Sequence, residues 1–171
     1  MYLCSDLMLK IHQFIQDEVD ARLFDGKNKT VILLGLYYRL FYDVLVRENN
    51  RFLHICTSIL YSAPSLKAAT DFIFDMVHSD TELQELNTEE HRFAIHLLNG
   101  GLSQTVNIYL NSDFHKSMQE YLDILFHAYT SNLGFTEAEQ QTISDIMNNV
   151  LTKTLRDRFY SKFLSEITDS Q

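Results

Sequence analysis

Residues 88–110 read TEEHRFAIHLLNGGLSQTVNIYL and predict one long helix. Thr88 can cap it, and Glu89 and Glu90 follow in the first turn, where the positive end of the helix dipole favours carboxylates. Its interior holds Gly100-Gly101, and each glycine costs about 1 kcal/mol relative to alanine. Because such a pair marks the close approach of a neighbouring backbone, we expect this apolar helix to lie at the centre of the fold.

The same spacing of apolar side chains, three and four residues apart, covers most of the chain, and 5 Gly and 1 Pro leave few breaks. Residues 30–46 are apolar almost all the way round, which predicts a helix covered on several sides. The predicted class is all-α, a single domain over residues 1–171 with seven or eight helices. The other predicted helices span 5–19, 52–60, 64–77 and 112–132, and a last helical region follows, opened by a capping box at Thr136 and Glu139. Ser5 or Asp6 would cap the first of these, and Asp25-Gly26 would stop it. Asn132-Leu133-Gly134 would stop the helix at 112–132.

The composition limits the classes of partner. Fourteen Lys and Arg stand against 23 Asp and Glu, and the net charge of −9 repels phosphate, so we do not expect a nucleic-acid partner. The densest apolar run, 31–46, is interrupted by Gly35, Arg39 and Asp43, and we expect no membrane anchor. Two cysteines, Cys4 and Cys56, form no disulfide framework, and no secretory signal is visible, which predicts a cytoplasmic protein.

The titratable residues do not form a recognisable catalytic or metal motif. His91 and His96 are five residues apart and point to different faces of a helix, and Asp75-x-x-His78 is only half of a di-iron pattern. We therefore expect no metal, no cofactor and no enzymatic activity. These residues alone leave three classes of protein open: a binding protein, another helical scaffolding or interaction domain, and an enzyme or cofactor carrier.

The helix at 88–110 resembles the fifth helix of the Bcl-2 family of apoptosis regulators. In that family the BH1 (Bcl-2 homology 1) motif Asn-Trp-Gly-Arg precedes a Gly-Gly pair whose first glycine lies eight residues after the arginine. Here Glu89-Glu90-His91-Arg92 takes the place of the motif, and Gly100 lies eight residues after Arg92. In this register 30–46 is similar to the second helix of the family, with Asp43 as a loose remnant of BH3 (Bcl-2 homology 3).

A competing register reads residues 66–71 as the BH3 segment, but it leaves 31–60 where relatives have a loop. The chain also departs from the family: His91 replaces the motif glycine, and tryptophan is absent, so the BH2 (Bcl-2 homology 2) signature cannot be matched. We also expect no membrane tail of the kind common in cellular relatives. Divergence of this degree resembles virally encoded homologues, such as those of large DNA viruses like the iridoviruses.

The resemblance implies an anti-apoptotic protein that sequesters the BH3 helices of pro-apoptotic proteins, for example Bim-like ones, and inhibits host-cell apoptosis. Arg92 would pair with the aspartate of the ligand, and His91 would obstruct many ligand backbones, which predicts a narrow ligand range. An exposed groove also predicts a homodimer through or beside it, and any contact with mitochondria would be made through partners. The implied groove residues are Leu45, Phe52, Leu53, Cys56, Phe72, Met76, Arg92, Ile95 and Asn99.

Overall fold

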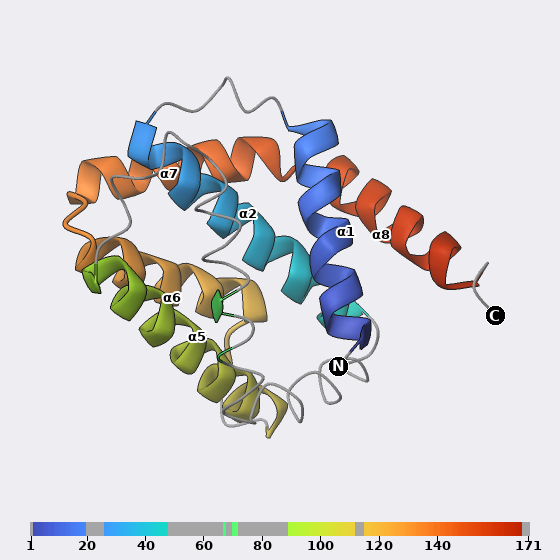
Figure 1. Ribbon diagram of the computed structural model, residues 1–171, viewed down its shortest axis with the longest axis horizontal. Coiled ribbons are helices and arrows are strands. Elements are labelled where there is room, and N and C mark those ends of the chain that lie inside the picture. The colour runs from blue at the N-terminus through green and yellow to red at the C-terminus, as the bar shows by residue number, and fades with distance from the viewer. Residues whose placement is uncertain are drawn as a thin grey trace.

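The computed structural model describes residues 2–19, 26–47, 67, 70–71, 89–111 and 115–168, and within these ranges the chain is helical and contains no strand (Figure 1). The predicted all-α class is confirmed for this part of the chain. The predicted helices at 52–60 and 64–77 lie outside it, apart from Lys67, Thr70 and Asp71, which are helical. The described helices are α1 (Tyr2–Glu18), α2 (Gly26–Arg47), α5 (Glu89–Leu110), α6 (Met118–Asn132), α7 (Glu137–Val150) and α8 (Lys153–Thr168).

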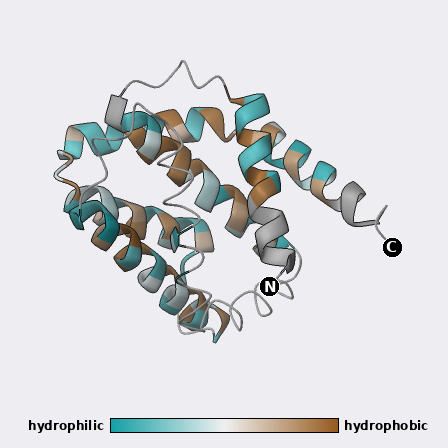
Figure 2. Ribbon diagram, viewed as in Figure 1, coloured by the Kyte–Doolittle hydropathy of each residue, from teal (hydrophilic) through white to brown (hydrophobic). Residues whose placement is uncertain are grey.

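Helix α2 is the centre of the described helices. It packs against α1, α6, α7 and α8, and in Figure 1 it runs between α7 and the α5–α6 pair. Figure 2 shows hydrophobic residues along α2, while the helices around it carry hydrophilic bands. The prediction of a helix covered on several sides is confirmed. Its buried apolar residues are Val31, Ile32, Leu34, Leu36, Tyr37, Tyr38, Leu40, Phe41, Tyr42 and Val44.

Among the described helices, α5 packs mainly against α6, while α2 contacts four of the others. The glycines of these two helices differ in how close their neighbours lie. No described atom lies within 4 Å of a Cβ built on Gly100, whereas a Cβ on Gly35 of α2 would lie 2.9 Å from Cζ of Phe126 and closer still to Sδ of Met147. Within the pair the close approach occurs at Gly101, where a Cβ would lie 3.0 Å from Cδ2 of Leu125, and a closer one that was not predicted occurs at Gly35.

Local signals fix several helix ends. The predicted capping box of α7 is confirmed, since the Thr136 amide donates to the Glu139 carboxylate (2.7 Å) and the Glu139 amide to the Thr136 hydroxyl. The predicted stop after α6 is also confirmed, because Asn132 ends the helix and Gly134 has a φ of +78°, a left-handed conformation that favours glycine.

Other ends differ from the prediction. Helix α6 begins at Met118, not near residue 112, because Ser117 and Glu120 form a second capping box. The hydrogen bonds from Ser117 lower the pKa of the exposed Glu120 carboxyl. The last helical region is divided at Leu151 into α7 and α8.

The first two helices also have other ends than predicted. Helix α1 already begins at Tyr2, before the expected cap, and it ends at Glu18. Gly26, which was expected to stop it, instead opens α2. None of the helices in the described ranges combines the length and apolar character needed to cross a membrane.

Candidate functional site

Helix α5 has one buried face and one exposed face. The buried face consists of His91, Ala94, Ile95, Leu98, Asn99, Leu102 and Val106. The exposed residues are Glu89, Glu90, Arg92, Phe93, His96, Leu97 and Gln104. Phe93 is 63% exposed and Leu97 is 50% exposed, which makes them large apolar side chains that the domain itself leaves in water. Since they are four residues apart, they lie one turn from each other on the same face, beside the guanidinium-bearing Arg92.

The buried face is held by polar contacts as well as by packing. The Tyr38 hydroxyl of α2 donates to Oδ1 of Asn99, and Nδ2 of Asn99 donates to Oγ1 of Thr70 at 2.9 Å. All three side chains are buried. Burial raises the pKa of Tyr38 well above its usual value, so the hydroxyl stays protonated and can donate. Asn99 therefore links α5 to α2 and to the helical residue Thr70.

His91 also belongs to the buried face. Its Nε2 lies 2.8 Å from the hydroxyl of Tyr129 on α6, and both side chains are buried. Burial raises the pKa of Tyr129, which keeps this hydroxyl protonated next to the imidazole. The expectation of a narrow ligand range rested on an imidazole that faces the ligand, whereas in the structure the imidazole faces α6.

The predicted groove residues on α5 do not share one surface. Arg92 is exposed, whereas Ile95 and Asn99 are buried. The exposed apolar neighbours of Arg92 are Phe93 and Leu97, which the sequence reasoning did not assign to the site. A signal for them was present, because Arg92 and His96 lie next to them on the helix and mark that side as solvated. The remaining predicted residues, Phe52, Leu53, Cys56, Phe72, Met76 and the side chain of Leu45, lie outside the described residues.

Arg39 forms a second polar cluster that the sequence reasoning treated only as a break in an apolar run. Its guanidinium, buried in α2, donates to Asp123 of α6 at 2.6 Å and to Asn148 of α7 at 2.7 Å. A pocket of about 370 Å³ between α6 and α7 has Arg39 and the buried Gln140 in its wall. Since the cation is already paired with a carboxylate, this cluster joins three helices rather than offering a free charge.

The C-terminal end of α2 is joined to α8 by ion pairs. Arg47 contacts Asp43 at 2.9 Å and Asp157 at 2.7 Å. Burial raises the pKa of the Asp43 carboxyl, while Arg47 and Arg156 act in the opposite direction. Asp43, the suggested remnant of a BH3 segment, is thus engaged in contacts within the domain.

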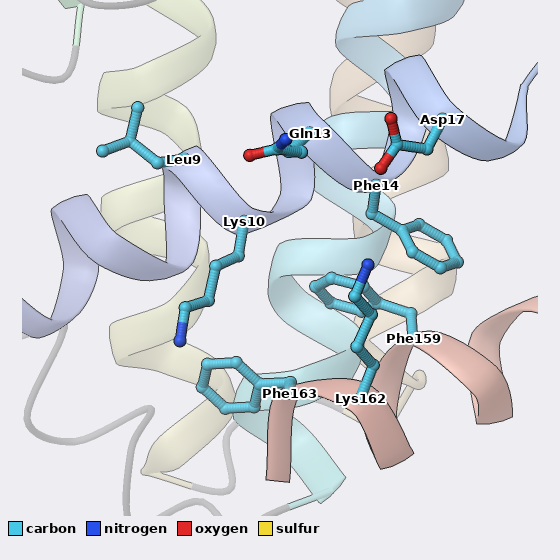
Figure 3. A pocket seen from close by; sticks show the side chains of 8 residues that line it. All are labelled: Leu9, Lys10, Gln13, Phe14, Asp17, Phe159, Lys162 and Phe163. Carbon is cyan, nitrogen blue, oxygen red and sulfur yellow. The ribbon is translucent and has the colours of Figure 1, made fainter. Parts of the chain in front are cut away.

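A pocket of about 450 Å³ lies between α1 and α8 (Figure 3). The rings of Phe14, Phe159 and Phe163 line it and are almost fully buried, and Nζ of Lys10 lies 5.9 Å from the centre of the Phe163 ring. Because the rings are already covered by the domain, an apolar ligand would remove little further surface from water. The exposed face of α5 is therefore the better candidate site.

Within the described residues no group of three or more His, Cys, Asp or Glu side chains could hold a metal ion. The exposed residues of α5 combine Arg92, Glu89, Glu90 and His96 with two apolar side chains, and no Ser, Thr or Cys nucleophile is among them. Their chemistry suits non-covalent recognition. Comparisons of the chain with protein-family models, curated proteins and solved structures found no match.

Proposed function

We propose that this protein binds an amphipathic helix of another protein on the exposed face of α5, as an anti-apoptotic Bcl-2-like protein that sequesters pro-apoptotic BH3 helices. The observation that carries the proposal is the exposure of Phe93 and Leu97 on a helix whose opposite face is firmly packed. Since Phe93 and Leu97 are already about half covered, burying the rest of each against apolar anchors of a ligand stabilises a complex by roughly 1–2 kcal/mol, about half of the value for full burial. The proposed activity is binding, without catalysis or a cofactor.

Arg92 gives this face a charge preference. The guanidinium lies at the edge of the apolar pair, one residue from Phe93, and the protein as a whole carries a net charge of −9. A ligand helix with one carboxylate opposite Arg92 gains a two-pronged charged contact, whereas a strongly acidic ligand is repelled by the rest of the surface. The proposed ligand is therefore apolar on one face, with a single acidic residue beside the apolar anchors.

The proposal keeps a Bcl-2-like bundle of seven to eight helices as the architecture. The predicted groove residues outside the described ranges would form the wall that faces α5. The proposed location is the cytoplasm, of the host cell if the chain is viral, where BH3 proteins act.

The test is a titration of a fluorescent BH3 peptide against wild-type protein and Arg92→Ala. We expect binding by the wild type and a loss of affinity of at least about tenfold in the variant, since removing one partner of a charge pair that becomes buried costs roughly 2–5 kcal/mol. Lys153→Ala is the matched control, because Lys153 is an exposed cation in the first turn of α8. Equal affinity of both variants, or no rise in melting temperature with peptide, would contradict the proposal.

A second candidate is an all-helical interaction domain of another kind. It is favoured by the position of α2, which replaces α5 at the centre of the described helices. The two candidates differ in one result. If BH3 peptides fail to bind while Phe93→Ala still abolishes capture of a different helical partner, the face is a docking site but the Bcl-2-like assignment is wrong.

A further inference from the structure

The pocket of about 370 Å³ between α6 and α7, called the α6–α7 pocket below, lies between two antiparallel helices. Gln140 of α7 is hydrogen-bonded to Ser131 of α6, and eight residues further along both helices Arg39 joins Asp123 to Asn148. The α7 residues that line the pocket extend from position 137 to position 147, which is about 15 Å along the helix. The pocket is therefore narrow and long.

Gln140 leaves one hydrogen-bond acceptor unsatisfied in the wall of this pocket. Its Nε2 donates to Oγ of Ser131 at 2.9 Å and to the carbonyl of Phe135 at 3.1 Å, which uses both amide hydrogens. The reverse orientation of the amide would set Oε1 against that carbonyl. Oε1 has no hydrogen-bond partner, although the residue is only 8% exposed. Since buried polar groups nearly always have a partner, this oxygen indicates a donor supplied from outside the chain.

The charged groups of the wall favour a positively charged ligand. Glu137 is exposed at one end of the pocket, and its carboxylate forms no hydrogen bond or ion pair with another described residue. At the other end Asp123 is 48% exposed, and the bonds that it accepts from Arg39 and Gln119 both go to Oδ1. An anion would have to displace Asp123 from Arg39, whereas a cation can bind at Oδ2. The net charge of −9 also attracts cations to this protein.

We propose that the α6–α7 pocket binds a linear polyamine, whose ammonium groups meet Glu137, Gln140 and Asp123. The methylene groups between them would lie over Phe126 and Ile143, which also line the pocket. The three acceptors are unevenly spaced, since Gln140 is about one helical turn from Glu137 and about two turns from the level of Asp123. A triamine with arms of unequal length, such as spermidine, matches this spacing.

The length of the pocket distinguishes a polyamine from a basic side chain of a protein partner. A lysine side chain has a single ammonium group and can meet only one of the three acceptors. The inference is also independent of the helix binding proposed for α5, because the lining residues belong to α2, α6 and α7. The two activities can therefore be lost separately.

The first test is calorimetric titration of spermidine into the full chain at about 0.15 M salt, where diffuse attraction is screened beyond roughly 8 Å. We expect one site with a dissociation constant of about 1 mM or tighter, and a weakening of about twofold to fivefold in Glu137→Gln. Glu89→Gln is the matched control and should leave the affinity unchanged, because Glu89 and Glu137 are both exposed first residues of a helix.

The second test exchanges the ligand. The compound 1,8-diaminooctane has the chain length of spermidine but a methylene group in place of the central nitrogen. It should bind at least about tenfold more weakly, since it brings no donor to Oε1 of Gln140. Gln140→Met removes the acceptor and should weaken spermidine but not the diamine. Circular dichroism checks folding, because this substitution also removes the bonds to Ser131 and Phe135. If the variant does not fold, the comparison of the two ligands on the wild type still decides.

The inference is overturned if spermidine does not bind in this range, if the two glutamate variants lose affinity equally, or if the diamine binds as tightly as spermidine. Equal loss in Glu89→Gln and Glu137→Gln would mean diffuse attraction to an acidic surface. Binding of N-acetyl-lysine amide as tight as that of spermidine would assign the pocket to a basic side chain of a protein instead. Spermidine binding without BH3 binding would overturn the proposed function alone.

Discussion

Helices α2 and α5 are both 22 residues long and both carry apolar side chains along their length, yet they differ in how far other helices cover them. Four of the described helices pack against α2, whereas α5 packs mainly against α6 among them and has an exposed face. The charged residues differ. Arg39 of α2 is buried and bonded to Asp123 and Asn148 of other helices, while Arg92 of α5 lies on the exposed side.

A helix at the centre of a domain must have its polar groups satisfied by its neighbours, because an uncompensated buried charge costs several kcal/mol. Helix α2 meets this condition through Asp123 and Asn148. Helix α5 avoids it, since Arg92 lies on its exposed side. An apolar helix that keeps a cation and a phenylalanine in solvent is suited to meet a partner, and this contrast separates the structural role of α2 from the binding role proposed for α5.

The largest expected effect comes from the same substitution made in both helices. Leu34→Ala in α2 removes a fully buried side chain and should lower the free energy of unfolding by about 2–5 kcal/mol, through lost burial and the cavity left behind. Leu97→Ala in α5 should change it by less than about 0.5 kcal/mol, because that side chain is half in water already. Urea unfolding measures both. Equal losses would mean that α5 is as well covered as α2.

The next effect concerns the two cations. Asp123→Ala leaves the buried Arg39 guanidinium without its carboxylate and should cost about 2–3 kcal/mol, below the usual range for a broken buried pair because Asn148 still accepts a hydrogen bond. Arg92→Ala should leave stability within about 0.5 kcal/mol. Asp145→Ala, an exposed carboxylate on α7, is the control for loss of an acidic side chain. A small effect of Asp123→Ala would show that solvent reaches Arg39.

The features of the fold that the sequence predicts correctly depend on local chemistry. The capping box at Thr136 and Glu139 and the glycine at 134 involve residues within one turn of each other, and the apolar circumference of 30–46 is a property of one helix. Such signals need no knowledge of the neighbouring helices. For that reason the all-α class and most of the described helices could be predicted.

The candidate site could be predicted only in part, because a helical period places residues on a common face without saying what covers that face. Arg92, predicted to pair with an aspartate of a ligand, lies on the exposed side of α5, but the exposed apolar pair beside it was not predicted. His91 was expected to face a ligand, yet the hydroxyl of Tyr129, 38 positions away, faces its imidazole. The contact that decides its role lies on another helix.

The smallest effects compare the glycines, and they should differ in sign. Gly35→Ala places a methyl group against Phe126 and Met147 and should cost about 1–3 kcal/mol, since overpacking outweighs the better helix propensity of alanine. Gly100→Ala meets no described atom and should gain up to about 1 kcal/mol. Gly101→Ala, whose methyl would lie 3.0 Å from Cδ2 of Leu125, should fall between them, because the end of a leucine side chain can move aside. Thermal and urea unfolding of the three variants give the order directly, and a loss of stability in Gly100→Ala equal to that in Gly35→Ala would mean that α5 is covered on the face assigned here to a partner.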